Sequence, residues 1–134
     1  MKKKKYPINK SEEEWSKILT KDEFYIMRKK GTERPFSGEY NMHFKNGIYA
    51  CRSCNQELYN SSSKFDSSCG WPSFDNAIPN STEYVKDFSH GMIRTEILCS
   101  NCGSHQGHLF YDGPTKTGKR YCVNSYSIKF IAKK

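Results

Sequence analysis

Apolar residues near the N-terminus recur at the spacing of a helix. Trp15, Ile18 and Leu19 fall on one helical face, and they follow the segment Ser11-Glu12-Glu13-Glu14. In such a segment the Ser hydroxyl accepts a hydrogen bond from the third backbone N–H of the helix, while the last Glu reaches back to the Ser N–H. The pattern predicts a capped helix that ends near Leu19.

A second helix is predicted directly after the first. Residues 20–23 (Thr-Lys-Asp-Glu) repeat the capping pattern, and the apolar residues Phe24, Ile26 and Met27 follow it. Three basic residues then precede Gly31, which is a typical helix stop. We expect both helices to cover a sheet and their aromatic residues to belong to the core.

Short stretches of alternating polar and apolar residues predict strands in the rest of the chain. We expect strands at 39–44, 47–50, 84–88, 92–98, 108–111, 121–124 and 127–131. The first two should form a hairpin around Asn46-Gly47. In the segment 92–98, Ile93 and Ile97 alternate with Arg94 and Glu96, which predicts a strand buried on one side. Without alternating strands and helices, the pattern indicates an antiparallel, mainly β fold.

Residues 60–82 are rich in Ser, Asn, Gly and Pro and predict an irregular surface segment. The segment nevertheless carries large apolar side chains, among them Phe65, Trp71, Phe74 and Ile78. A loop with such side chains must pack on the core or form the wall of a pocket.

The composition fits one domain with its own core, since the chain has 134 residues, 35% of them hydrophobic. Residues 1–10 are predicted to be a flexible basic arm, and residues 11–134 a single domain. The net charge of +8 permits a nucleic-acid-binding module as an alternative. Six of the positive charges lie at the two ends, at Lys2 to Lys5, Lys133 and Lys134, which favours solvated tails. No apolar run suits a membrane span or a secretory signal, so we expect a cytoplasmic monomer without nucleic-acid or membrane partners.

Two Cys-x-x-Cys pairs, Cys51/Cys54 and Cys99/Cys102, offer four thiolates. This spacing lets two sulfurs of one turn face the same ion, and zinc favours tetrahedral sulfur coordination. We expect one structural zinc ion per chain, closed to chemistry because all four ligands come from the protein. Iron in the same cage, or two separate redox dithiols, are the alternatives.

Cys69 and Cys122 remain outside these pairs, as do His105 and His108. Arg120 and its neighbour would favour a thiolate at Cys122. A thiolate nucleophile, a nearby imidazole and a second thiol that resolves an oxidised sulfur form a coherent set. The alternative is that the spare cysteines are small buried apolar residues.

Four segments together resemble the type B methionine sulfoxide reductases, which act on the R epimer. They are residues 31–40 (Gly-Thr-Glu-Arg-Pro-Phe-Ser-Gly-Glu-Tyr), 69–74 (Cys-Gly-Trp-Pro-Ser-Phe), 99–110 (Cys-Ser-Asn-Cys-Gly-Ser-His-Gln-Gly-His-Leu-Phe), and the region 112–125 that ends in Arg-Tyr-Cys-Val-Asn-Ser. The resemblance covers roughly residues 11–131. It implies a fold of two antiparallel sheets in a barrel-like core (Mss4-like, or β-tent) with N-terminal helices packed on it.

The resemblance also implies roles for individual residues. Cys122 matches the nucleophile, Cys69 the resolving cysteine of a subset of members, and Trp71 the aromatic wall for the substrate methyl group. The matches to polar groups around the sulfoxide oxygen are His105, His108 and Asn124; Phe110 is expected beside the substrate, and Cys51, Cys54, Cys99 and Cys102 match zinc ligands. The implied function is thiol-dependent reduction of methionine-R-sulfoxide, protein-bound or free, with thioredoxin as the reductant. Such an enzyme repairs proteins under oxidative stress.

The sequence departs from the family pattern at Gln106, Lys119 and Tyr126. Gln106 lies between the two histidines and is expected to alter the polarity of the pocket, and Tyr126 to narrow it. Besides a nucleic-acid-binding module, a chaperone-like zinc-stabilised β module stays open as an alternative, because a fold does not fix a function.

Overall fold

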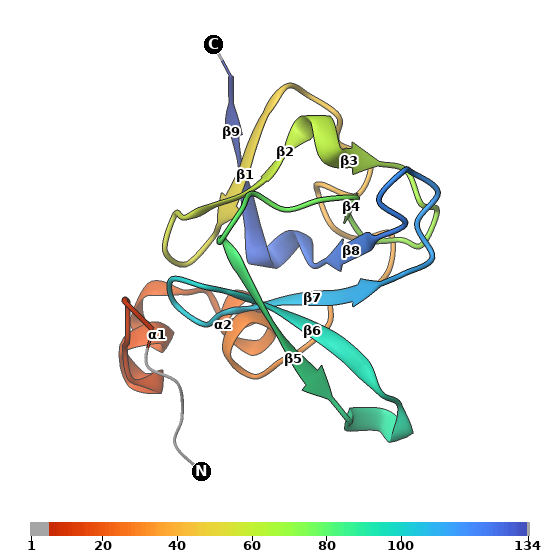
Figure 1. Cartoon of the computed structure of the whole chain (residues 1–134). Coiled ribbons are helices and arrows are strands. Elements are labelled where there is room, and N and C mark those ends of the chain that lie inside the picture. The colour runs from red at the N-terminus through yellow and green to blue at the C-terminus, as the bar shows by residue number, and fades with distance from the viewer. Residues whose placement is uncertain (1–5, 134) are drawn as a thin grey trace.

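Residues 6–133 are described by a computed structural model, shown in Figure 1, and comprise two α-helices followed by nine strands. The helices are α1 (Glu12–Ile18) and α2 (Lys21–Arg28). The strands are β1 (Gly47–Cys51), β2 (Glu57–Asn60), β3 (Lys64–Phe65), β4 (Ser73–Phe74), β5 (Thr82–Asp87), β6 (Arg94–Cys99), β7 (His105–Phe110), β8 (Arg120–Val123) and β9 (Ile128–Ala132). Three single 3-10 turns, η1 (Ser61–Ser63), η2 (Ser89–Gly91) and η3 (Ser125–Ser127), link some of them.

The strands form two antiparallel sheets, as predicted. One has the order β2-β1-β9, and the other has the order β3-β4-β8-β7-β6-β5. The core is therefore enclosed by two open sheets, which do not close into one barrel. A single apolar cluster joins them: Tyr59 of β2 stacks on Phe74 of β4 with ring centroids 4.4 Å apart.

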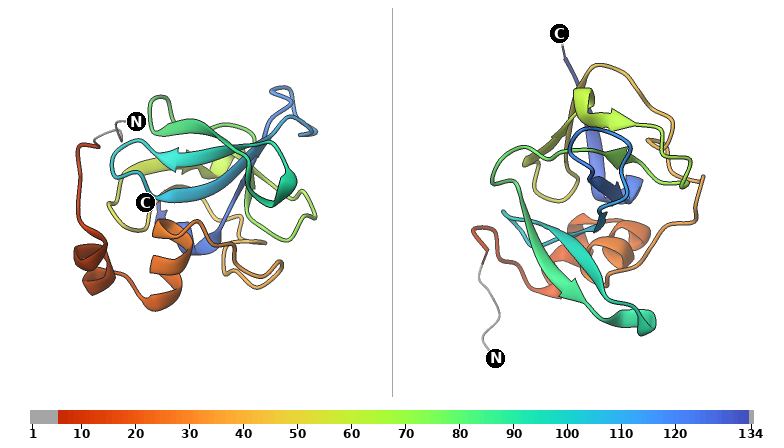
Figure 2. Two further views of the ribbon diagram at one scale, coloured as in Figure 1. Left: turned by 90° about the horizontal axis from the view of Figure 1, so that it is seen from below. Right: turned by 45° about the vertical axis from the view of Figure 1, so that its right-hand side comes forward.

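Both predicted helices are present, with the predicted caps. The hydroxyls of Ser11 and Thr20 accept from the third helical N–H, and Glu14 and Glu23 accept from the cap N–H in return. The helices lie together on one side of the strands (Figure 2), and α2 packs against β7 and η3. Their inward side chains are Trp15, Leu19, Ile26 and Met27, whereas Ile18 is 58% exposed.

The predicted strand at 39–44 and its hairpin with β1 are absent; residues 38–42 form turns instead. Tyr40 and His43 pack edge-on against Tyr49, and His43 also contacts Phe130. The alternation in this segment therefore reflects ring packing from a loop. β1 pairs with β2 on one side and with β9 on the other.

The segment predicted to be irregular contains two short strands, β3 and β4, and β2 ends at its border. Phe74 is fully buried, so the expectation that its apolar residues pack inward is confirmed. The prediction that β6 is buried on one side is wrong. Ile93 is 72% exposed, while Glu96 and its neighbour Ile97 are both buried, because Glu96 holds a buried histidine described below.

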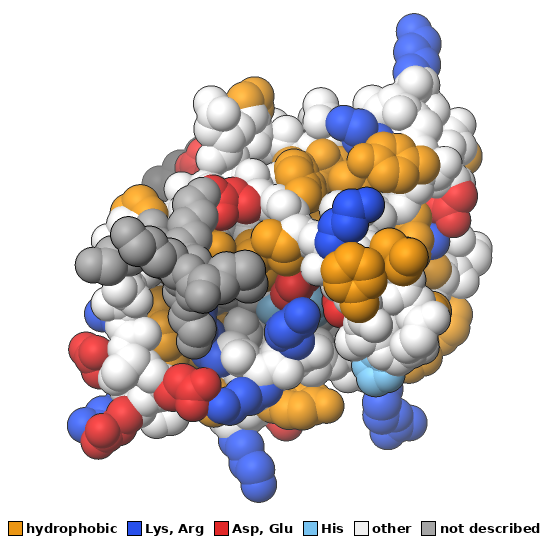
Figure 3. All heavy atoms as spheres, turned by 60° about the horizontal axis from the view of Figure 1, so that its bottom comes forward, with side chains coloured by type: hydrophobic (Ala, Val, Ile, Leu, Met, Phe, Trp, Pro, Cys, Tyr) orange, Lys and Arg blue, Asp and Glu red, His pale blue; other side chains and the backbone are white. Residues whose placement is uncertain are grey.

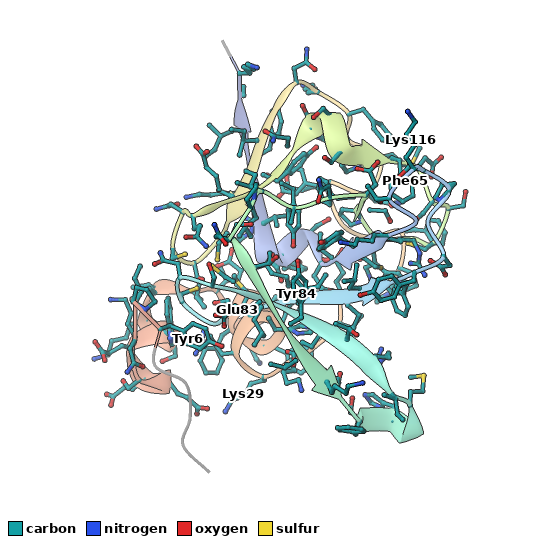
Figure 4. The ribbon with its side chains drawn as sticks, in the orientation of Figure 1. Tyr6, Lys29, Phe65, Glu83, Tyr84 and Lys116 are labelled. Atoms are coloured by element: carbon teal, nitrogen blue, oxygen red, sulfur yellow. The ribbon has the colours of Figure 1, made fainter. Side chains whose placement is uncertain are left out.

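Lys2 to Lys5 lie outside the described residues. From Tyr6 onward the predicted basic arm contacts the domain: the Tyr6 ring packs on Gly103, and the Ile8 N–H donates to the Asn101 carbonyl at 2.8 Å. Figure 4 places Tyr6 beside the two helices. Among residues 6–133, no helix combines the length and apolar character required to cross a membrane.

Candidate active site and metal centre

A cavity of about 220 Å³ opens on the six-stranded sheet where β7 and β8 run side by side. Its walls are Thr32, Cys69, Trp71, Arg94, His105, Gly107, His108, Phe110, Arg120, Cys122, Val123 and Asn124. These include every residue that the sequence nominates for catalysis or substrate binding. The two thiols and two imidazoles that remained after the metal ligands were assigned thus line the same cavity.

Strand register places the central thiol. Cys122 in β8 lies directly opposite His108 in β7 and opposite Ser73 in β4. Cross-strand partners project to the same face of a sheet, so the Cys122 and His108 side chains are neighbours. Gly107 permits this close pairing, because a Cβ there would lie 1.9 Å from the Cys122 carbonyl oxygen.

A bulge in β7 explains how both histidines reach the cavity. Residues three apart on a regular strand point to opposite faces. Here Leu98 pairs with His105 and Ile97 pairs with Gly107, so Gln106 is an extra residue in the strand. The bulge reverses the alternation, and His105 and His108 both line the cavity with ring centroids 5.4 Å apart.

Each histidine is held by a buried carboxylate. Nδ1 of His105 lies 2.6 Å from Glu96 and Nε2 of His108 lies 2.7 Å from Asp87. An ionised carboxylate can only accept, so these nitrogens carry the protons. The hydrogen bond from His108 holds the pKa of Asp87 well below its usual range. Burial opposes ionisation of Glu96, but the His105 hydrogen bond prevails and its pKa is lowered.

The other nitrogen of the His105 ring is left for a ligand. Nε2 of His105 is buried and has no protein partner among the described residues. Burial lowers the pKa of His108, and Arg94 adds to the lowering, while the Asp87 carboxylate raises it. The site therefore holds two oriented imidazoles whose second nitrogen can accept or, once protonated, donate a proton.

Lys30 links the two carboxylates. Its Nζ lies 3.2 Å from Glu96 and 3.8 Å from Asp87, and it approaches from the end of α2. Lys30 lowers the pKa of both carboxylates. Arg94 contributes a further contact at 3.6 Å from Asp87. Nothing in the sequence connects these four residues, since they lie on three separate segments.

Cys69 and Cys122 are both reduced, with 3.8 Å between their sulfurs. The hydrogen bond from the Cys122 thiol lowers the pKa of Cys69 to about 4, and hydroxyls of Ser67 and Ser73 add to this against the effect of burial. The same hydrogen bond and burial raise the pKa of Cys122, while Arg120 works in the opposite direction. In the reduced pair this contact favours the negative charge on Cys69, and the thiolate expected at Cys122 stays a prediction.

Glu33, which the sequence did not single out, organises the rest of the wall. Its carbonyl accepts from the Trp71 indole N–H at 3.0 Å, and its N–H donates to the Asn124 side chain at 3.0 Å. Its buried carboxylate accepts from the Tyr126 N–H. The Asn124 side chain also donates to the Gln106 carbonyl, which fixes the amide at the cavity edge.

Two departures from the family pattern lie outside the cavity, contrary to expectation. The Gln106 side chain is fully buried and points toward Cys51 and the Ser127 carbonyl. Tyr126 is half-exposed and lines a different hollow beside Arg52. Neither side chain can set the polarity or width of the cavity directly.

The four remaining cysteines form a buried cluster on the other side of the bulge. Cys51 ends β1 and Cys54 lies in the turn after it, and Cys99 ends β6 with Cys102 in the turn that follows. All four sulfurs lie within 4.8 Å of one another, with 3.7 Å between Cys51 and Cys102. Sulfurs at the corners of a zinc tetrahedron, with bonds of about 2.3 Å, lie about 3.8 Å apart. The cluster therefore fits a metal ion of this size.

Both turns of the cluster are built alike. The residue after each pair, Asn55 or Gly103, has a left-handed backbone and donates its N–H to the first cysteine carbonyl at 2.8 Å. Gly103 meets this need without strain. The Ser53 hydroxyl contacts the sulfurs of both Cys51 and Cys102 at 3.2 Å, so a hydroxyl is available to neutralise sulfur charge.

Comparison with known proteins places the chain in a family. Residues 19–132 match the model of the SelR domain, and the chain belongs to that family. It is 52% identical over 124 residues to a protein of Methanosarcina barkeri named peptide methionine sulfoxide reductase MsrB, covering 92% of this chain and 87% of that protein. Proteins of the same name from Variovorax paradoxus and Pseudomonas fluorescens are 48% and 49% identical and cover 95% and 92% of this chain, and 98% and 96% of their own length.

The fold is also found outside the family. The crystal structure of the Mis18 Yippee-like domain superposes with a TM-score of 0.54 at 15% identity, covering 67% of this chain and 99% of that domain. At this identity the likeness concerns the fold alone.

Proposed function

We propose that this chain reduces methionine-R-sulfoxide to methionine with thiols as the electron source. The observation that carries the proposal is the placement of Cys122, opposite His108 in the sheet and 3.8 Å from Cys69, in a cavity walled by Trp71. Together with membership of the SelR family, it gives each of the spare cysteines and histidines a task. The reaction belongs in a reducing compartment such as the cytoplasm.

The first step activates the substrate. A sulfoxide oxygen is a poor leaving group until it is protonated, and a positioned acid contributes about 100- to 10,000-fold to such a step. His105 and His108, once doubly protonated, can donate from the nitrogen that faces the cavity. Glu96 and Asp87 orient the rings, and Asp87 raises the pKa of His108 against the larger effect of burial.

The second step is attack by Cys122 on the sulfoxide sulfur. A proton that passes from Cys122 to the Cys69 thiolate across their 3.8 Å contact supplies the nucleophile. This attack forms a bond between the two sulfurs while the protonated oxygen leaves as water. Water then attacks the Cys122 sulfur, the bond between the two sulfurs breaks, and methionine leaves with Cys122 as a sulfenic acid. The substrate sulfur is reduced by two electrons and Cys122 is oxidised by two.

The third step closes a disulfide. The Cys69 sulfur attacks the sulfenic acid on Cys122, the hydroxyl leaves as water, and a Cys69–Cys122 bond forms. An external dithiol, for which we propose thioredoxin, then returns both cysteines to thiols. The short distance between the two sulfurs means that this closure needs little movement.

The cavity would select one epimer because one of its walls is apolar and another is polar. Trp71 and Phe110 offer apolar surface for the substrate methyl group, while the oxygen must face the histidines. The Arg120 guanidinium lies 4.4 Å from the Phe110 ring centre, which holds that ring in place. In the S epimer the methyl group and oxygen exchange places and lose both matches.

The cluster of Cys51, Cys54, Cys99 and Cys102 would hold one zinc ion. With four protein ligands the ion has no open position, so it would tie β1 to β6 and take no part in the reaction. Its contribution is to fix the strand that carries Glu96 and the bulge next to it.

The decisive test is an assay of methionine formation from separated R and S sulfoxides of a methionyl peptide, with dithiothreitol as reductant. We expect activity on the R epimer alone and its loss in Cys122→Ser. Cys69→Ser should release one equivalent of methionine in a single turnover but fail to recycle with thioredoxin. Glu57→Gln, at an exposed position on β2 outside the cavity, is the control for a neutral effect. Full activity of Cys122→Ser would refute the proposed nucleophile.

The sequence also raised a basic nucleic-acid-binding module and a chaperone-like module as alternatives. Neither function would require two thiols and two imidazoles in one cavity. On the face shown in Figure 3, acidic and basic side chains are interspersed. A salt-dependent gel shift that survives deletion of residues 1–5 would favour nucleic-acid binding. Failure of oxidants to form a Cys69–Cys122 bridge would favour a binding module.

A further inference from the structure

A second cleft reaches Cys69 from outside the substrate cavity. Its walls are Asp66, Ser67, Cys69, Asp112, Pro114 and Arg120. The two hollows share Cys69 and Arg120, but Cys122 lines the substrate cavity alone. Cys69 is therefore open to two sides, and Cys122 to one.

Two loops face each other across this second cleft. The β3–β4 loop supplies Asp66, directly after Phe65, and the β7–β8 loop supplies Asp112 and Pro114, shortly before Lys116. Figure 4 shows Phe65 and Lys116 on the same side of the molecule. The β7–β8 loop is tied in place by the Thr117 hydroxyl, which donates to the Asp75 carbonyl at 2.8 Å.

The sheet shields Cys122 on both flanks, because β8 lies between β4 and β7. Its register partners, Ser73 and His108, occupy those flanks. A thiolate that attacks a disulfide approaches the sulfur from the side opposite the leaving sulfur. For Cys69 that side is the one turned away from Cys122, and the second cleft reaches Cys69 without being lined by Cys122.

We propose that the second cleft is the entry site of the reductant, and that an uncharged or cationic dithiol attacks Cys69 rather than Cys122. The proposal rests on the proposed function, since it requires the Cys69–Cys122 disulfide. A bond forms between the reductant sulfur and Cys69, the Cys69–Cys122 bond breaks, and Cys122 leaves as a thiolate. The second thiol of the reductant then displaces Cys69, so two electrons pass to the protein and the reductant leaves as a disulfide.

The leaving sulfur has a charged neighbour. Burial raises the pKa of Cys122 and Arg120 lowers it; because thiols of lower pKa leave faster, the guanidinium assists this departure. Arg120 is itself held by two hydrogen bonds to Asp112, at 2.8 and 3.1 Å. Once Cys69 is bonded to the reductant, it no longer holds the negative charge that opposes ionisation of Cys122. The released thiolate then faces the substrate cavity, ready for the next turnover.

The charge of the cleft predicts which thiols enter. Asp112 and Arg120 form an ion pair and cancel, which leaves the formal negative charge of Asp66. At low ionic strength, one negative charge on the wall of the cleft should make a cationic thiol react about three- to tenfold faster than an anionic one. Asp66→Asn should remove the preference, whereas Asp22→Asn, on the exposed face of α2, should keep it.

The test uses the full, metal-loaded chain with its Cys69–Cys122 bridge formed by diamide and confirmed by peptide mapping. The bridged protein is treated briefly with cysteamine, mercaptoethanol or mercaptoethanesulfonate, then alkylated with N-ethylmaleimide. Mass spectrometry locates the mixed disulfide, and rates are compared per thiolate. We expect the adduct on Cys69, alkylated Cys122, and the order cysteamine, mercaptoethanol, mercaptoethanesulfonate.

An adduct on Cys122 would overturn the proposal. An adduct on Cys69 whose charge preference is unchanged in Asp66→Asn would overturn the assignment of the entry cleft. Failure of diamide to form the bridge would reject both this route and the recycling pathway. A diamide bridge that forms, with no bridge after turnover of the R-sulfoxide, would reject only the recycling step of the proposed function.

Discussion

Nδ1 of His105 lies 2.6 Å from Oε2 of Glu96, and both side chains are almost completely buried. The carboxylate fixes the tautomer of the ring and aims its free Nε2 at the cavity. A buried charge is stable only with such partners, so the hydrogen bond from His105 stabilises the buried carboxylate of Glu96. The proposed acid therefore depends on a residue that does not line the cavity.

Glu96→Gln should lower kcat for the R-sulfoxide by about 100-fold, because the amide keeps the shape but cannot stabilise the protonated ring. Thermal unfolding should show a folded protein, so that the loss is assigned to the reaction. Glu57→Gln, an exposed position on β2, is the matched control. An activity within twofold of the unmodified chain would exclude His105 as a proton donor held by Glu96.

Lys30→Met should move the alkaline limb of the pH profile of kcat to higher pH, because without Lys30 the carboxylates attract protonated histidine more strongly. The shift should be less than about one pH unit, since a half-exposed lysine contributes roughly 0.5–1 kcal/mol to such pairs. Lys30→Arg should restore the original limb. Lys29→Met is the control, since Lys29 pairs with Glu12 instead, 2.8 Å away, and points away from the sheet in Figure 4.

Asp87→Asn should move the alkaline limb of kcat to lower pH, opposite to the shift expected for Lys30→Met. The pKa of His108 is already lowered by burial, and the Asp87 carboxylate is what raises it. A histidine that donates a proton loses this ability as the pH rises through its pKa, so a lower pKa brings the loss at lower pH. The measurement is kcat from pH 5 to 9 for the variant and the unmodified chain. A limb that stays in place would show that His108 does not supply the proton.

Trp71→Ala should reduce kcat/KM for an R-sulfoxide peptide by about 30-fold, because roughly 2 kcal/mol of apolar contact is lost. Trp71→Phe keeps an aromatic wall but removes the indole hydrogen bond to the Glu33 carbonyl, and should cost about fivefold. The ratio of R to S turnover should fall in Trp71→Ala. An unchanged ratio would mean that the indole does not select the epimer.

Cys102→Ser should lose the metal and much of the stability, because structural zinc sites contribute on the order of 10 kcal/mol of binding energy to folding. We expect the Tm to fall by more than about 10 °C. Cys69→Ser, a cysteine outside the cluster, should keep both metal and Tm. The measurements are metal content by atomic absorption and thermal unfolding on the same samples; equal Tm values would refute a structural metal.

The helices were predictable because their signals are local. Ser11 with Glu14, and Thr20 with Glu23, satisfy the first helical N–H groups from within four residues. The strand at 39–44 failed for the opposite reason: Tyr40 and His43 alternate like a strand but pack as rings against β1 and β9, which are distant in sequence. Alternation alone cannot distinguish these two ways of burying an aromatic side chain.

The cavity was predictable as a list of residues but not as a network. Family resemblance nominated Cys122, Cys69, Trp71 and the histidines, and all of them meet in one hollow. Glu33, in the segment between α2 and β1, and Asp87 and Glu96, in strands, were missed, because a carboxylate is interpreted as a solvent-facing residue until its buried partner is known. The charge favoured on Cys69 depends on the 3.8 Å contact between the two sulfurs, which the sequence does not reveal.

The extra residue at position 106 has a consequence for mutation and evolution. Deleting Gln106 would leave every proposed catalytic group in the chain and shorten β7 by one position, yet it would turn His105 to the opposite side of the sheet, toward the four-cysteine cluster. The number of residues in this strand therefore matters as much as their identity. A change in its length would abolish activity even though every sequence motif remained.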